Sequence, residues 1–243
     1  MSIAYHGLPM TGSDAAVAAV VLPGRHAFVS FAKPSQLPLA RELCASYAVD
    51  NGAFGAWRSG NPIADWTPYY DWVDALDGPF DFAVIPDVID GDMAANDALV
   101  VEWPHAYLGA PVWHLHEPLY RLERLVNEWP RVCLGSSGDY STPGTQAWWW
   151  RMEAAMAVAC DVDGKPIAKL HGLRMMDPAL YRIPFHSVDS TSVGRNTAID
   201  GAWQGRYAPP TKGWRAVVLA ARFEHNQAAP RWVPSAQMDL GVA

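Results

Sequence analysis

The stretch SVDSTSVGRN, residues 187–196, combines one carboxylate with hydroxyls, a guanidinium and an amide one residue after the apolar segment YRIPF. Asp189 ends a run that is apolar enough to form a buried strand, and an aspartate is ordinarily ionised at pH 7. Such a group can act as a nucleophile or as a general base. A plainer interpretation is that Ser190 or Ser192 caps a short helix, because serine oxygens accept hydrogen bonds from the first free amides of a helix.

Polar, titratable or glycine residues follow five other apolar runs in the same way. Each group has a plain explanation when it is taken alone: Asp50 precedes an Asn-Gly turn, Gly135 could turn the chain into a helix, and His171 could be a packed core histidine. Six such ends in succession are hard to attribute to turn chemistry. The groups are Asp50-Asn51-Gly52, Asp87, His114 with His116-Glu117, Gly135-Ser136-Ser137-Gly138, His171-Gly172 and Asp189-Ser190-Thr191.

The apolar runs that carry these ends alternate with helical patterns along the whole chain. Eight strand–helix alternations in 243 residues predict a single (β/α)8 barrel over residues 1–243. An open, doubly wound sheet is the alternative, but it would usually carry a glycine-rich phosphate loop, and the sequence has none. In a barrel the active site lies at the carboxyl ends of the strands, where these polar groups fall. The expected strands are 3–6, 27–32, 47–50, 82–87, 111–116, 131–135, 167–172 and 184–189, and the expected helices are 13–21, 34–45, 65–76, 117–129 and 145–159.

Composition restricts the class of protein. Half of the residues are hydrophobic and 18% are charged, which is typical of a folded globular protein. No apolar run reaches the ~18–20 residues of a membrane span, and the first residues lack a secretory signal pattern. Three widely spaced cysteines favour neither a disulfide framework nor a zinc site, so we expect a cytoplasmic protein without membrane partners.

Charge is unevenly distributed along the chain. The formal net charge is −7, which argues against a general coat for nucleic acid. From Lys165 to Arg231, however, ten basic and four acidic residues give a net +6. That part of the chain could face phosphate groups while the rest of the surface stays acidic.

Two aspartates at the mouth of a barrel suit the chemistry of a glycosidic bond. One carboxylate attacks the anomeric carbon, and the other gives or takes the proton of the departing or entering group. A third carboxylate can accept hydrogen bonds from the edge of a base.

The ordered motifs resemble those of the tRNA-guanine transglycosylases. VDNGAF, residues 49–54, is similar to their Asp-Ser-Gly-Gly-Phe element, and SVDSTSVGRN is similar to their late strand end, which carries the nucleophile. Four segments stand between them in the order that the family keeps: IPDVIDG, HLHE, LGSSG and LHGL. The resemblance covers residues 47–196.

The resemblance implies roles for three aspartates. Asp189 would be the nucleophile that forms a covalent bond to the sugar C1′ atom, and Asp50 would be the general acid and base for the departing and incoming bases. Asp87 would read the Watson–Crick edge of the purine. The residues that the resemblance and the expected pocket assign to substrate binding are Asp87, His116, Gly135, Ser136, His171, Phe54, Arg195 and Asn196.

Two departures from the family pattern narrow the resemblance. The tRNA enzymes carry a cysteine-rich zinc site after the nucleophile strand, and here no cysteine follows Cys160. The chain is also much shorter than those enzymes, and it is therefore most similar to the compact, DpdA-like DNA-guanine transglycosylases of phages and bacteria. This resemblance implies DNA, or alternatively tRNA, and a 7-deazaguanine base as substrates, with no metal and no cofactor.

A metal-dependent hydrolase of the amidohydrolase type is the alternative function. His114 and His116 would project to the same side of one strand, and His171 and Asp189 could complete a ligand set. In that family the His-x-His pair lies on the first strand, whereas here it lies on the fifth. A catalytically inactive nucleic-acid-binding barrel is a third possibility.

Overall fold

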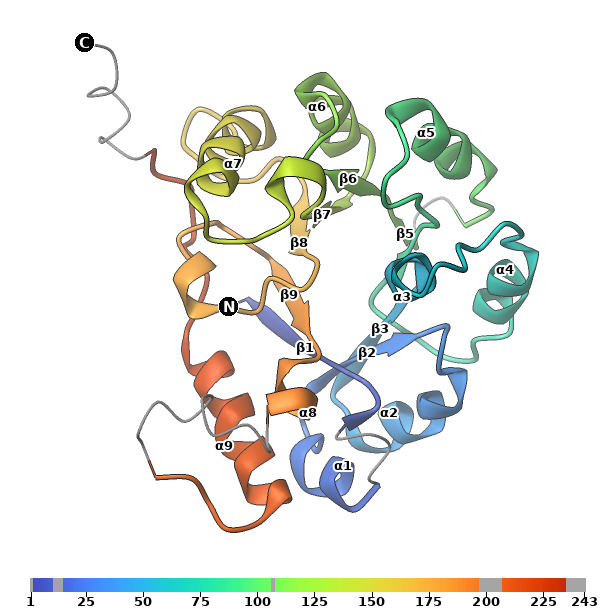
Figure 1. Ribbon diagram of the computed structural model, residues 1–243, viewed down its shortest axis with the longest axis vertical. Helices are drawn as coiled ribbons and strands as arrows, with labels where there is room; N and C mark the ends of the chain where they lie inside the picture. The colour runs from blue at the N-terminus through green and yellow to red at the C-terminus, as the bar shows by residue number, and fades with distance from the viewer. Residues whose placement is uncertain (1, 11–14, 106–107, 197–206, 235–243) are drawn as a thin grey trace.

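The computed structural model describes residues 2–10, 15–105, 108–196 and 207–234. Their strands form one parallel sheet that curves into a nearly closed barrel, and the helices surround it (Figure 1). The sheet order is β5-β4-β3-β2-β1-β9-β8-β7-β6, and every paired neighbour is parallel. The predicted α/β barrel is therefore confirmed. Its strands are β1 (Ile3–Gly7), β2 (His26–Ser30), β3 (Ser46–Asp50), β4 (Ala83–Val84), β5 (Gly109–Ala110), β6 (Val112–His114), β7 (Arg131–Gly135), β8 (Lys169–Gly172) and β9 (Ser187–Ser190).

The described residues contain nine strand segments where eight strands were expected, because a further two-residue segment precedes the predicted strand 111–116. β5 and β6 are separated only by Pro111, which has no backbone N–H to donate. The carbonyl of Pro111 still accepts a hydrogen bond of 2.8 Å from the Cys133 amide. β5 pairs with β4 and β6 pairs with β7, so this interrupted strand joins the two ends of the sheet.

The helices follow the strands and cover the outside of the barrel (Figure 1). The five predicted helices are present, α8 is the short helix of the plainer interpretation of residues 187–196, and α3, α5 and α9 were not predicted as elements. α9 packs beside α1 and continues the helical layer past β9. The bounds are α1 (Ala15–Val21), α2 (Leu37–Leu43), α3 (Ala53–Arg58), α4 (Thr67–Asp74), α5 (Met93–Glu102), α6 (Leu119–Glu128), α7 (Gln146–Ala159), α8 (Ser192–Asn196) and α9 (Lys212–His225), with short 3-10 turns at Pro34–Gln36, Gly138–Tyr140 and Pro178–Leu180. Within the described ranges, none of these helices has the length and apolar character that crossing a membrane requires.

Side-chain oxygens define the start of several helices. Asp92 accepts a hydrogen bond of 2.9 Å from the Ala95 amide at α5, and Thr145 accepts one of 3.4 Å from the Trp148 amide at α7. Thr211 does the same for the Trp214 amide at α9, at 3.3 Å. These caps satisfy amides that have no partner inside the helix.

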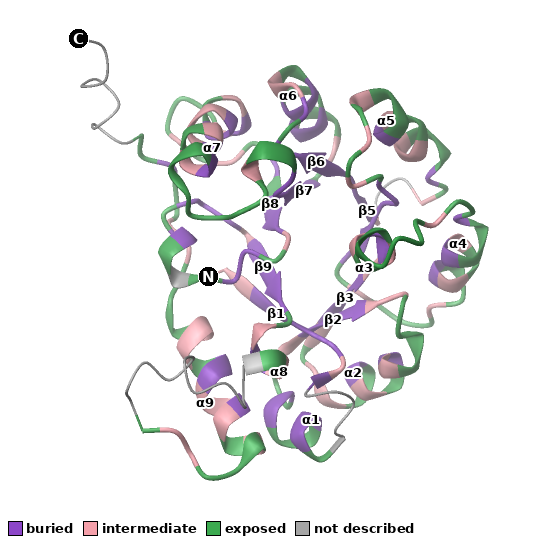
Figure 2. Cartoon of the chain, in the orientation of Figure 1, coloured by how far each residue is buried: buried purple, intermediate pink, exposed green. Residues whose placement is uncertain are grey.

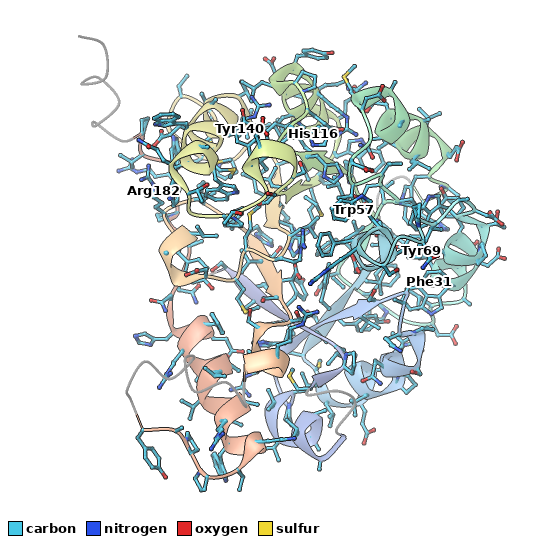
Figure 3. All side chains as sticks on the ribbon, in the orientation of Figure 1. Phe31, Trp57, Tyr69, His116, Tyr140 and Arg182 are labelled. Carbon is cyan, nitrogen blue, oxygen red and sulfur yellow. The ribbon has the colours of Figure 1, made fainter. Side chains whose placement is uncertain are left out.

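The interior of the barrel is packed and largely aromatic. The rings of Tyr5, Phe28 and Phe82 are in mutual contact, with centroids 5.8–6.1 Å apart, and all three side chains are buried. Figure 2 shows that the strands are mostly buried and that exposed residues lie on the outer faces of the helices. On the outside of the sheet, Phe31 packs against Tyr69, whose hydroxyl donates to the Val84 carbonyl at 2.8 Å (Figure 3). The site described below therefore rests on a filled barrel.

A buried ion pair joins the β6 end to α6 and α5. Arg121 Nη1 lies 2.7 Å from Glu117 Oε2, and both side chains are buried. Arg121 Nε also donates to Asp97 Oδ1 at 2.8 Å, while Asn96 donates to Glu117 Oε1 at 3.0 Å. Glu117 in turn accepts the His114 amide at 2.9 Å. Glu117 thus has a structural role, which is to hold the end of β6 against α5 and α6.

Removing the Arg121 guanidinium should destabilise the fold strongly, because Glu117 would remain buried without its ion-pair partner. We expect Arg121→Met to lower the free energy of unfolding by about 3–5 kcal/mol, measured by denaturant titration. The matched control is Arg124→Met, since Arg124 is exposed and also contacts Asp97, at 2.6 Å. This control should cost less than about 1 kcal/mol. Equal losses in the two variants would contradict the assignment.

Candidate active site

A pocket of about 260 Å³ opens at the carboxyl end of the barrel. Strand ends from most of the sheet contribute to its walls, as the barrel topology predicts. Seven of the ten predicted site residues line it: Asp50, Phe54, Asp87, Gly135, Ser136, Asp189 and Arg195.

Asp50 is held at the end of β3 by a tight turn. Gly52 has a φ of 81°, a left-handed conformation that favours glycine, and its amide donates to Asp50 Oδ2 at 3.1 Å. The expected Asn-Gly turn is thus present, and it orients the carboxyl group. The pKa of Asp50 is raised to about 7, chiefly by burial and further by the neighbouring Asp189 and Asp87 carboxylates, against hydrogen bonds from Ser30 and Gly52. A carboxyl group with this pKa can both give and take a proton near neutral pH.

Asp189 is held at the end of β9 by contacts from the β8 side. The Arg174 amide donates to Asp189 Oδ1 at 2.7 Å, and His171 Nε2 lies 3.4 Å from the same oxygen. The hydroxyl of Ser190, the next residue in the chain, contacts Ser192. It donates to Ser192 Oγ at 2.6 Å and accepts from the Ser192 amide at 2.9 Å. Ser190 therefore stabilises the turn into α8, as the plainer interpretation of this stretch had it.

Asp87 is fixed by an amide side chain and an imidazole. Asn51 Nδ2 donates to Asp87 Oδ1 at 2.7 Å and to the Ile85 carbonyl at 2.9 Å. His114 Nε2 lies 2.9 Å from Asp87 Oδ2, and both side chains are buried. Because a carboxylate oxygen has two lone pairs, Asp87 keeps acceptor capacity toward the pocket. Asn51 and His114 were not among the predicted site residues, although both lie in the polar strand ends from which the prediction started.

Gly135 and Ser136 line the pocket, but their polar groups already have partners. The Gly135 carbonyl accepts from the Leu115 amide at 2.9 Å, and Ser136 Oγ accepts from Trp148 Nε1 at 2.9 Å. A Cβ atom on Gly135 would lie 3.1 Å from His114 Nδ1. The glycine therefore leaves the space that the His114 ring occupies beside Asp87.

Arginines form the outer part of the pocket. Arg58, Arg174 and Arg195 line it and are exposed. The Arg174 guanidinium stacks on Phe54, with its carbon 3.3 Å from the ring centroid. Phe54 is among the residues assigned to substrate binding, and this arginine covers one face of its ring. Arg174 has a φ of 57°, unusual for a residue other than glycine.

Of the other predicted residues, His116 and His171 do not line the pocket. His116 is exposed at the rim, where its Nδ1 contacts Ser137 Oγ at 2.7 Å and its Nε2 donates to the Gly91 carbonyl at 2.9 Å (Figure 3). His171 is fully buried beneath Asp189, so a direct contact with substrate is not supported. The side chain of Asn196 lies outside the described part of the structure.

The four residues of the metal alternative are not assembled into one ligand set. His114 and His116 do stack, with centroids 5.7 Å apart, but His114 faces Asp87 while His171 faces Asp189. Over residues 2–10, 15–105, 108–196 and 207–234, no group of three or more histidine, cysteine, aspartate or glutamate side chains is arranged to hold a metal ion. The geometry thus gives the hydrolase alternative no specific support.

The chain matches no family model, no curated protein and no solved structure in the comparisons made with it. Inference about function therefore depends on the site itself and on the resemblance of its motifs.

The raised pKa of Asp50 can be tested through stability, independently of any activity. The carboxyl group binds its proton more tightly in the folded chain, at about 7, than in the unfolded chain, at about 3.9. Its contribution to stability is therefore greatest below pH 4 and is lost as the pH rises to 7. Asp50→Asn cannot ionise, so it should become more stable relative to the wild type between pH 5 and pH 8, measured by denaturant titration at each pH. Asp139→Asn, at an exposed carboxylate, is the control. Parallel stability curves for Asp50→Asn and the wild type would contradict the raised pKa.

Proposed function

We propose that this protein is a nucleic-acid guanine transglycosylase, which exchanges a guanine for a 7-deazaguanine base, with DNA as the favoured polymer. The observation that carries the proposal is the convergence of Asp50, Asp87 and Asp189 on one pocket at the carboxyl end of the barrel. These aspartates occupy the positions to which the transglycosylase-like motifs assign the general acid and base, the base-reading group and the nucleophile.

The first half of the reaction removes guanine. The Asp189 carboxylate attacks the sugar C1′ atom, the bond from C1′ to the base nitrogen breaks, and its electron pair goes to the base. Asp50, protonated near neutral pH, gives its proton to the departing guanine. The products are free guanine and a glycosyl ester on Asp189.

The second half of the reaction restores the nucleoside. The incoming base gives its proton to the Asp50 carboxylate, and its nitrogen attacks C1′ and displaces the Asp189 carboxylate. Two displacements on the same carbon retain the configuration of the sugar. The proton that Asp50 gives to the departing guanine is replaced by the proton of the incoming base. The aspartates therefore suffice for the exchange as written.

Asp87 is placed to read the base. Asn51 and His114 hold both of its oxygens in fixed directions, which limits the positions from which a base N–H can donate. The carboxylates lie inside the barrel mouth, so a target nucleotide has to leave its stack to reach them. The exposed Arg58, Arg174 and Arg195 offer cations for the phosphates on either side of that nucleotide.

Replacing the proposed nucleophile tests this function directly. Asp189→Asn keeps the size of the side chain and removes the attacking charge, so it should abolish exchange of radiolabelled guanine into DNA oligonucleotides or tRNA. Guanine is a suitable probe because the exchange assay then needs no knowledge of the modified base. Asp139→Asn is the matched control and should exchange at the wild-type rate. Exchange by Asp189→Asn at the wild-type rate would refute the mechanism, and absence of exchange by the wild type on both polymers would refute the function.

The arginines at the pocket edge should contribute to binding more than to chemistry. Arg195→Ala and Arg58→Ala should each weaken oligonucleotide binding and reduce the slope of log Kd against log salt concentration by about one. The measurement is a fluorescence-anisotropy titration at several salt concentrations, with Arg231→Ala as a control outside the pocket. An unchanged salt slope in both pocket variants would show that these residues do not contact phosphate.

A further inference from the structure

Beneath Asp189, a line of polar groups is buried inside the barrel. His171 and Ser187 are fully buried, and Arg131 is nearly so. His171 Nδ1 lies 2.9 Å from Ser187 Oγ, and Arg131 Nη1 donates to the same oxygen at 3.0 Å. The Arg131 guanidinium stacks over Phe82, at 4.3 Å from the ring centroid, which fixes its place in the barrel. The line thus runs from Arg131 through Ser187 and His171 to Asp189.

The direction of each hydrogen bond follows from the kinds of groups involved. A guanidinium only donates, so Ser187 Oγ accepts from Arg131. The Ser187 hydroxyl hydrogen then has the Nδ1 lone pair of His171 as its acceptor. If Nδ1 carried the proton instead, the buried hydroxyl hydrogen would have no partner in the described contacts, which is costly. The Arg131–Ser187 pair therefore favours a lone pair on Nδ1 and a proton on Nε2.

The other end of the imidazole leads to the same assignment. Nε2 makes no geometrically good hydrogen bond, and Asp189 Oδ1 is 3.4 Å away. A lone pair on Nε2 would face the carboxylate and repel it, whereas an N–H would attract it. Hydrogen bonds between catalytic groups often have long donor–acceptor distances until substrate binds.

We propose that His171 is a positioning residue for Asp189, held by Ser187 and Arg131 in the neutral Nε2–H form so that a fixed donor faces the nucleophile. The tautomer stands on the contacts alone, and its role in the reaction rests on the proposed function. The charged groups near the ring are Asp189 on one side and Arg131 on the other. The aromatic rings of Phe82, Phe28 and Tyr5 pack around it, with centroids 5.0–5.9 Å from it.

A neutral imidazole suits this place. Burial lowers the pKa of His171, and Arg131 lowers it further, against the opposite effect of Asp189. An imidazolium would form a full ion pair with the nucleophile and weaken its attack. A neutral donor, together with the Arg174 amide, orients one oxygen and leaves the other free.

The tautomer can be measured directly by nitrogen NMR. Long-range proton–nitrogen correlation spectra separate the two neutral tautomers and the imidazolium, and the His171 signals are assigned by their loss in His171→Gln. We expect the Nε2–H pattern at pH 7 in the wild type and loss of this preference in Ser187→Ala. An Nδ1–H or imidazolium pattern in the wild type would overturn the proposal, and so would an unchanged pattern in Ser187→Ala. This readout needs no activity, so it stays decisive if guanine exchange fails.

The role toward Asp189 is tested by two variants of similar size. The amide nitrogen of His171→Gln can replace the Nε2–H donor, whereas His171→Met fills similar space without a donor. We expect kcat for guanine exchange to fall about 10- to 100-fold in His171→Met and to recover most of this loss in His171→Gln, with KM nearly unchanged in both. Backbone amide spectra check that each variant folds. Equal kcat values for the two folded variants would overturn the positioning role, while failure of the wild type to exchange guanine would count against the proposed function.

Discussion

Three carboxylates share one pocket of about 260 Å³, and their mutual repulsion is the constraint that the rest of the site accommodates. Like charges in a partly dry site cannot all be ionised at low cost. The pKa of Asp50 is raised to about 7, chiefly by burial and further by the two neighbouring carboxylates, and Asp87 and Asp189 are each contacted by an amide and an imidazole. A difference in protonation between carboxylates of one site is the arrangement that acid–base and nucleophilic roles require. The close placement of the three carboxylates therefore both creates their repulsion and supports their different roles.

The arrangement of polar groups continues below the pocket, inside the barrel. Aromatic rings fill the barrel interior, and they do not solvate a charged group as water does. The polar groups inside the barrel therefore contact one another. His171 contacts Ser187 and Asp189, while Tyr5 donates to Asp81 at 2.7 Å near the opposite end of the strands. Arg131 lies over Phe82 and reaches Ser187. The floor of the site is thus largely aromatic, and one line of buried polar groups runs through it to Asp189.

The sequence predicted the strands better than the helices, for physical reasons. Each strand is a buried apolar run, and all eight expected runs contain strands of the barrel, whereas α5 buries only Asn96 and shows no apolar stripe. α3 is six residues long and contains a glycine. α9 was readable, since Thr211 precedes it and Ala216, Leu219 and Ala220 lie at helical spacing. The division at Pro111 follows from its missing N–H, which could have been anticipated.

The sequence predicted site residues correctly where the position of a residue on its strand determines where its side chain lies. Asp50, Asp87 and Asp189 end parallel strands, so the topology alone gathers them at one mouth. Arg174 was missed because its contact with Asp189 depends on a left-handed backbone conformation that no sequence pattern marked. His171 was expected to line the pocket. It lies one residue before the end of β8, and its side chain is in the barrel interior.

The central claim is that Asp189 forms a covalent bond with the sugar during exchange. Trypsin cleavage after Arg182 and Arg195 releases a peptide, residues 183–195, in which Asp189 is the only side-chain carboxylate. The wild-type protein is incubated with a guanine-containing DNA oligonucleotide or tRNA without added base, denatured in acid, digested with nuclease and trypsin, and analysed by mass spectrometry. We expect this peptide with a sugar-phosphate fragment attached at Asp189 and with guanine released. Guanine release with the fragment on another residue, or release with no attached fragment, would contradict it.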